Sequence, residues 1–133
     1  MKHNDKNKAA LIQYRIEQAN NTIETVKLLI ENDKYNAAIN RIYYGMFYIL
    51  LAIAVKTGFE TSKHQQLIGW FNKTFIKEDI LPKRFGKTIS QVFKSRQISD
   101  YEAFVEFEKK EVLQLFEDMK DFIKTLEEYL KNN

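Results

Sequence analysis

Several residue types are scarce in this chain. It contains no cysteine, one proline and four glycines among 133 residues. The absence of cysteine excludes disulfide bonds, thiolate metal ligands and a cysteine nucleophile. So few helix-breaking residues favour long uninterrupted helices over a turn-rich β fold. The glycines are scattered along the chain, which excludes a glycine-rich phosphate-binding loop.

Histidine and long apolar runs are also scarce. The two histidines, His3 and His64, are far apart and lack the paired spacing of metal ligands. The longest apolar run, residues 42–55, is shorter than the ~20 residues that span a membrane. Residues 1–8 are polar and lysine-rich, unlike a secretory signal. We therefore expect a cytoplasmic protein with no membrane segment, no bound metal and no cofactor.

The composition is that of a globular domain. Hydrophobic residues make up 44% of the chain and charged residues 29%, a balance typical of folded proteins. Ten phenylalanines and seven tyrosines provide bulk for a helical core. The length is typical of one domain, so we predict a single helical domain over residues 1–133, with residues 1–7 as a flexible tail.

The charge is unevenly distributed along the chain. Residues 63–96 carry eight basic and two acidic side chains, whereas residues 97–133 carry five basic and ten acidic ones. A basic middle third beside an acidic C-terminal third suggests a surface that faces phosphate groups. A solvated basic face that pairs with the acidic helix would explain the pattern equally well.

Apolar periodicity predicts an all-α protein. We expect an up-and-down four-helix bundle with one additional short helix, because short connections place successive helices antiparallel. The long helices are expected over residues 8–32, 34–57, 63–77 and about 100–131, and the short one over 83–93. We expect residues 95–100 to form a loop, followed by a capping box between Ser99 and Glu102. Phe104 is placed on the inner face of the last helix.

The second of these helices is unusually apolar. From Ile42 to Val55 it is hydrophobic on every side, and a helix of this kind is buried on every side. A bundle of this size rarely covers all faces of one helix. The helix is therefore either central in the bundle or partly covered by a second subunit, which predicts a homodimer.

Polar residues interrupt the apolar pattern in three places. At the first, Arg41 shares a helical face with Tyr44 and Tyr48. A buried arginine is costly unless it is paired or faces a wet cleft. The second place is His64, which could cap a helix or contact phosphate.

The third interruption combines Arg96, Asp100 and Tyr101. An Arg96–Asp100 pair that holds a loop, with Tyr101 packed beneath it, would explain these residues structurally. Alternatively, a fixed guanidinium beside a phenol would suit a phosphate group.

The three interruptions together resemble the HEPN domain family, especially its small stand-alone prokaryotic branch. The order and spacing of the motifs carry the resemblance, which covers nearly the whole chain: Asn40-Arg41-Ile42-Tyr43-Tyr44-Gly45-Met46-Phe47, Lys63-His64, and Arg96-Gln97-Ile98-Ser99-Asp100-Tyr101.

The resemblance implies both a fold and a set of activities. HEPN domains are up-and-down four-helix bundles with a short additional helix that typically dimerise, and polar residues line a cleft near the dimer interface. Many are metal-independent ribonucleases that act as toxins and are encoded beside a minimal nucleotidyltransferase. Others bind nucleotides without cleaving RNA.

One departure from the family pattern bears on catalysis. In the ribonucleases an arginine is followed by four to six residues and then by a histidine. Arg96 matches that arginine. The permitted positions hold Tyr101, Glu102 and Ala103 instead, so the usual acid–base partner is missing. In some paired systems the transferase adenylylates a tyrosine near the arginine, and Tyr101 is the candidate acceptor here.

Three functional hypotheses follow. The first is a dimeric module that binds nucleotide or RNA phosphate through Arg41, Tyr44, His64 and Arg96, and works with a nucleotidyltransferase in a toxin–antitoxin or defence-type system. The second is a divergent ribonuclease toxin with Arg96, Asp100 and Tyr101 as catalytic residues. The third is a non-catalytic structural dimer. The missing histidine favours binding over catalysis.

Overall fold

The computed structural model describes residues 2–102 and 104–133, with side chains from Lys6 onward. It is 82% helical, and the described residues form no strand. The elements are α1 (Lys2–Glu31), α2 (Tyr35–Thr57), α3 (His64–Phe71), the short π-helix η1 (Asn72–Ile76), α4 (Arg84–Tyr101) and α5 (Lys109–Asn132).

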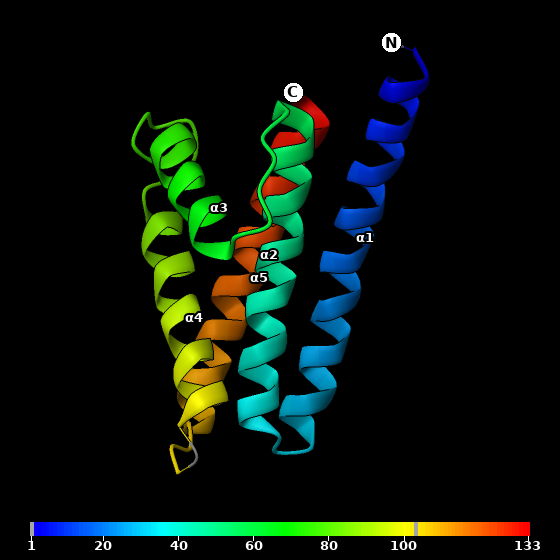
Figure 1. Cartoon of the computed structure of the whole chain (residues 1–133). Coiled ribbons are helices and arrows are strands. Elements are labelled where there is room, and N and C mark those ends of the chain that lie inside the picture. The colour runs from blue at the N-terminus through cyan, green and yellow to red at the C-terminus, as the bar shows by residue number, and fades with distance from the viewer. Residues whose placement is uncertain (1, 103) are drawn as a thin grey trace.

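The helices run alternately up and down. In Figure 1, α1 and α2 form a hairpin joined by a tight turn, while α4 descends beside α2 and α5 returns behind it. The short α3 lies above α4, at the end of the bundle where α2 finishes. The predicted all-α bundle with an additional short helix is confirmed.

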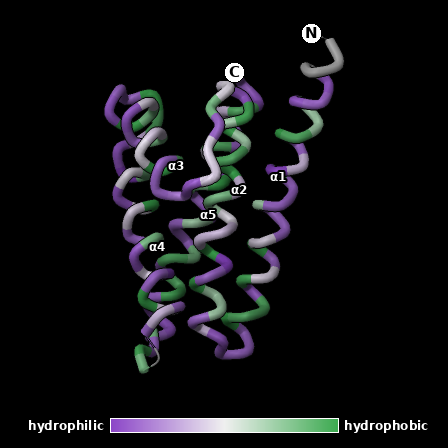
Figure 2. The backbone as a smooth tube through the Cα atoms, viewed as in Figure 1, coloured by the Kyte–Doolittle hydropathy of each residue, from purple (hydrophilic) through white to green (hydrophobic). Residues whose placement is uncertain are grey.

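The core is organised around α2. Eleven of its residues are buried, and it packs against α1, α4 and α5. Figure 2 shows green, hydrophobic segments along the sides of the helices that face one another. By length and composition α2 could cross a membrane, but 67% of its most apolar window is buried inside the protein, as in the core helix of a bundle.

One side of α2 is only partly covered by other helices. The aromatic and aliphatic side chains on this side are half-buried rather than enclosed: Tyr44, Phe47, Tyr48 and Leu51. Phe47 and Tyr48 each lie three or four residues from both Tyr44 and Leu51, so the four side chains form a continuous stripe along one face of the helix. This stripe, the open face of α2, carries the candidate site at its N-terminal end.

One glycine ends α2, and another allows its neighbours to pack closely against it. Gly58 adopts a left-handed conformation, φ 81°, and ends the helix as predicted. Gly45 lies where helices meet, because a Cβ there would collide with Met119 Cε and come within 3.2 Å of Thr22 Cγ2. The missing side chain therefore allows α1 and α5 to approach α2 closely.

The prediction for residues 83–100 was wrong in one respect. The short helix continues without a loop to Tyr101, and Ser99 Oγ donates to the Arg96 carbonyl within that helix rather than capping the next one. The stretch is polar in sequence and therefore has the composition of a loop. Contacts of Phe93 and Arg96 with α2 hold it helical.

The two terminal helices also differ from the prediction. α5 begins at Lys109, where Glu108 and Glu111 form the capping box that was expected at Ser99 and Glu102. Phe104 precedes this helix and is 98% exposed, so its predicted place on an inner face was wrong. α1 begins at Lys2, so residues 2–7 extend the helix that was expected to start at residue 8.

Candidate phosphate-binding site

Arg96 occupies the centre of the candidate site. Its Cζ lies 5.0 Å from the ring centroid of Tyr43 and 5.5 Å from that of Tyr44. Its Nη2 donates to the Tyr44 hydroxyl at 3.4 Å. These cation–π contacts anchor the last part of α4 on the N-terminal half of α2, and they hold the guanidinium in one place.

A single carboxylate accompanies this guanidinium. Arg96 Nε lies 3.0 Å from Asp100 Oδ2, and the two side chains are 16% and 27% exposed. The Nε–H is buried and is not aimed at the carboxylate for a hydrogen bond, so the pair is held by charge. Asp100 also accepts from Asn40 Nδ2 at 3.4 Å. The predicted Arg96–Asp100 pair is confirmed, on a helix rather than a loop.

Arg41 brings a second guanidinium to the ring of Tyr44. Its Cζ lies 4.8 Å from the centroid of Tyr44, which confirms that these residues share a helical face. Its Nε donates to Asn40 Oδ1 at 3.1 Å. No carboxylate lies within 4.0 Å of Arg41 in the described part of the chain. Two guanidiniums thus lie on one ring while only Arg96 is paired with a carboxylate, so the site carries excess positive charge.

His64 joins this cluster from the start of α3. Its ring stacks on Phe47 with centroids 4.0 Å apart and an interplanar angle of 27°. Its Nδ1 lies 2.8 Å from the hydroxyl of Tyr43. Burial and then the charge of Arg96 lower the pKa of His64 below its usual 6.5, so the imidazole is neutral at pH 7.

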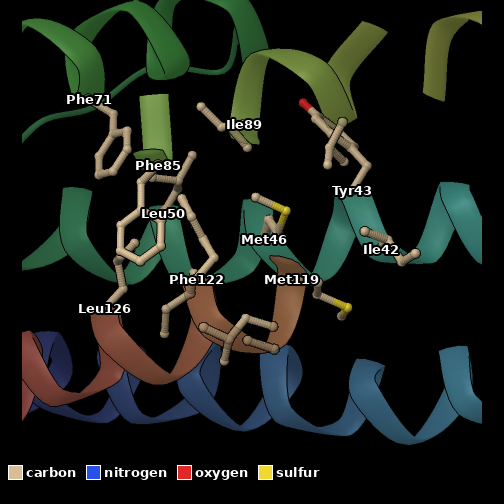
Figure 3. Close-up of a cluster of buried hydrophobic side chains, with 14 of the residues drawn as sticks. Ile42, Tyr43, Met46, Leu50, Phe71, Phe85, Ile89, Met119, Phe122 and Leu126 are labelled. Carbon is tan, nitrogen blue, oxygen red and sulfur yellow. The ribbon is translucent and has the colours of Figure 1, made fainter. Parts of the chain in front are cut away.

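Burial also shifts the pKa of Tyr43, the hydrogen-bond partner of His64. Tyr43 is fully buried, and desolvation raises the pKa of its phenol above the ordinary value of 10.0 despite the nearby charge of Arg96. Tyr43 therefore keeps its proton. Figure 3 shows its ring extending from α2 toward α4, above Ile42 and Met46.

A shallow, open hollow lies beside Arg41 and Asp100. Its volume is about 480 Å³ between α1, α2 and α4, and it is lined by Thr25, Leu29, Asn36, Ala37, Asn40, Arg41, Ser99 and Asp100. A wider hollow of about 770 Å³ lies near the turn between α1 and α2. Three of its eight lining residues, Asp33, Glu106 and Glu108, are acidic, which makes it the less suitable place for an anion.

The structure brings most of the predicted site residues together. Arg41, Tyr44, His64, Arg96 and Asp100 all lie at the open face of α2. The exception is Tyr101.

Tyr101 is 77% exposed, so its predicted packing beneath the Arg96–Asp100 pair was wrong.

Tyr43 and Phe47, which support Arg96 and His64, had no individual role in the sequence-based hypotheses. Their partner His64 lies 21 residues beyond Tyr43, so no local pattern connects them. Ala103, which occupies the last permitted histidine position, lies outside the described residues.

The basic middle third is only partly neutralised by the acidic helix. Arg84 on α4 forms a two-pronged contact with Asp121 on α5, at 2.9 and 3.1 Å. Lys83 pairs locally with Asp79. In the described chain the remaining lysines of this stretch have no carboxylate within 4.0 Å: Lys63, Lys73, Lys77, Lys87 and Lys94. The charge asymmetry therefore leaves unpaired cations around α3 and α4.

Fold and site together define a class of protein. It is a small helical bundle in which polar and charged side chains gather at one end of a central apolar helix, between α2 and α4. The chain belongs to the HEPN family, because the model of the HEPN domain matches residues 12–129. All residues of the candidate site fall within that range.

Relatives in three organisms support this assignment. A UPF0332 protein of Thermotoga maritima is 34% identical over 92% of this chain and 88% of its own length. Two proteins of Methanocaldococcus jannaschii whose names provisionally describe them as toxins are also similar. One is 31% identical over 86% of this chain and 78% of its own length. The other is 30% identical over 68% and 67%. A UPF0332 protein of Pyrococcus horikoshii is 25% identical over 59% of this chain and 56% of its own length.

Proposed function

We propose that this HEPN domain binds the phosphate groups of RNA or a nucleotide at the open face of α2. The observation that carries the proposal is the excess of positive charge there: Arg41 and Arg96 both lie over the ring of Tyr44, and Asp100 is paired with Arg96 alone. Planar guanidiniums match the geometry of phosphate oxygens. The neighbouring hollow offers room for part of a nucleotide.

A second feature supports binding over a purely structural role. A structural arginine cluster would be expected to satisfy its own charges. Here Arg41 has no carboxylate partner among the described residues, although Arg96 is paired with Asp100. A guanidinium without a counter-charge is suited to pair with an external anion.

The test is binding of a fluorescently labelled single-stranded RNA to the purified protein. Affinity is expected to fall steeply between about 50 and 200 mM salt, because phosphate contacts release counterions. Alanine at Arg96 or at Arg41 is expected to weaken binding by roughly 10- to 100-fold, which is the range for losing a charged hydrogen bond. Labelled ATP, titrated in parallel, distinguishes nucleotide from RNA as the ligand.

Arg84→Ala provides the matched control. Arg84 lies on the same helix, is paired with Asp121, and stands about 18 Å from Arg96 along the helix axis. Its removal should leave affinity within about twofold, in line with the small effects of exposed ion pairs. Equal losses in all three variants, or no loss at Arg41 and Arg96, would contradict the proposed site.

A divergent metal-independent ribonuclease is the alternative, and one observation favours it. His64 contacts the same two tyrosine rings as Arg96, so a histidine lies near the arginine in space although none follows it in sequence. Cleavage of the labelled RNA in the presence of a chelator, lost on Arg96→Ala, would establish this activity. Intact RNA would leave binding as the function.

The proposal includes a homodimer and a toxin-related context. The stripe of half-buried side chains on α2 is apolar and continues away from the charged cluster, so a second copy of the chain would bury it. The toxin names of the archaeal relatives agree with a role in a toxin–antitoxin or defence-type system. A nucleotidyltransferase is the partner we propose for that system.

Tyr101 is proposed as the residue that such a transferase would modify. It lies near the C-terminal end of α4, five residues after Arg96, and its 77% exposure leaves it accessible. Co-expression with a neighbouring nucleotidyltransferase should add an adenylyl group to Tyr101, detected by peptide mass spectrometry and lost in Tyr101→Phe. An unmodified Tyr101, or modification at another tyrosine, would contradict this role.

A further inference from the structure

His64 has two ring nitrogens in different surroundings. Nδ1 lies 2.8 Å from the Tyr43 hydroxyl, whereas Nε2 has no hydrogen-bond partner among the described residues. Nε2 is also not among the buried polar atoms that lack a partner, so it reaches solvent. The imidazole therefore has one nitrogen held inside the protein and one facing outward at the candidate site.

The Tyr43 hydroxyl restricts which nitrogen carries the proton. Tyr43 is fully buried, and His64 Nδ1 is the hydrogen-bond partner of its hydroxyl in the described structure. If Nδ1 carried a proton, that proton would occupy the contact and the phenol hydrogen would be left buried without an acceptor. Such an orphaned donor is disfavoured by roughly tenfold or more. The phenol is therefore the donor and Nδ1 the acceptor.

We propose that Tyr43 is a positioning residue which fixes neutral His64 with its proton on Nε2, so that His64 offers a hydrogen-bond donor to an anion beside Arg96. The stack on Phe47, with centroids 4.0 Å apart, sets the plane of the imidazole. The hydrogen bond from Tyr43 sets its rotation and tautomer. The inference rests on the proposed function only for the identity of the anion.

The groups around the imidazole agree with this state. Tyr43 and Tyr44 face it from α2 and Arg96 acts on it from α4, and none of the three supplies a negative charge that would favour a cationic histidine. The pKa of His64 is lowered by burial and by Arg96. One consequence concerns the ribonuclease alternative: with Nε2 already protonated at neutral pH, His64 is a donor there and not a general base.

The test combines a tautomer measurement with a binding cycle. Long-range ¹H–¹⁵N NMR of the free protein at pH 7.5 should show His64 protonated on Nε2 (about one pH unit above the ordinary pKa of histidine). Tyr43→Phe keeps the ring under Arg96 but removes the hydroxyl, and is expected to shift His64 toward a mixture of tautomers. Tyr35→Phe is the matched control, because its hydroxyl bonds Asp33 instead, and should leave His64 unchanged.

Binding of the same labelled RNA then reports the role of the hydrogen bond. Tyr43→Phe is expected to weaken RNA binding by roughly three- to tenfold, in line with the loss of one hydrogen bond. In the Tyr43→Phe, His64→Ala double variant, the tyrosine change should have no further effect.

The outcomes separate the two proposals. A wild-type protein protonated on Nδ1, an unchanged tautomer in Tyr43→Phe, or additive binding losses would overturn the role of Tyr43. Failure of the wild-type protein to bind RNA or ATP would instead contradict the proposed function, and the tautomer spectra of the free protein would still decide whether Tyr43 positions His64.

Discussion

Ile49→Glu is expected to prevent folding. Ile49 lies in the middle of α2 and has no exposed surface, so the substitution places a carboxylate in the core with no cationic partner. Burying an unpaired charge costs several kcal/mol even after relaxation, against a total stability of about 5–15 kcal/mol for a domain of this kind. Circular dichroism should show loss of helix, and urea unfolding should show no cooperative transition.

Leu51→Glu is the control that separates folding from assembly. Leu51 is half-buried on the open face of α2, where a carboxylate can reach water. This variant should remain helical and unfold cooperatively, while size-exclusion chromatography with light scattering should show a monomer in place of the dimer that we propose for the wild type. A folded Ile49→Glu variant of unchanged mass would disprove the burial of α2, and an unchanged Leu51→Glu dimer would disprove the proposed interface.

Phe122→Ala is the second substitution with a large expected effect. Phe122 on α5 is fully buried and meets two rings edge to face: Phe85 of α4 at 5.2 Å and Phe71 of α3 at 5.7 Å. Figure 3 shows these three side chains close together. Truncation leaves a cavity between three helices and should reduce the free energy of unfolding by about 3–5 kcal/mol. Urea denaturation with an unchanged m-value would measure this loss.

The control for Phe122→Ala lies on the same helix. Leu113 is 42% exposed, and its replacement by alanine should cost less than about 1 kcal/mol, because little surface is removed from the interior. Comparable losses in the two variants would mean that α5 contributes through its helix propensity rather than through the aromatic cluster.

Much of the fold could be predicted from local patterns. The apolar content of α2, its end at Gly58 and the helical nature of the other segments depend on residues near one another in the chain, and these predictions are confirmed, although the lengths of α3, α4 and α5 differ from those expected. The part around residues 95–108 could not be predicted in this way. Its polar composition is typical of a loop, yet Arg96 binds the aromatic rings of α2 and keeps the chain helical through Tyr101.

For the candidate site, the sequence determined the kinds of residue but not their arrangement. Arg41, Arg96 and Asp100 stood out as polar interruptions, and the Arg96–Asp100 pair follows from a four-residue separation on a helix. Only the tertiary structure placed the two guanidiniums on one tyrosine ring, left them with one carboxylate, and joined Tyr43 to His64. The physical reason is that helical periodicity acts over a few residues, whereas the packing of α2 against α3 and α4 decides which distant side chains meet.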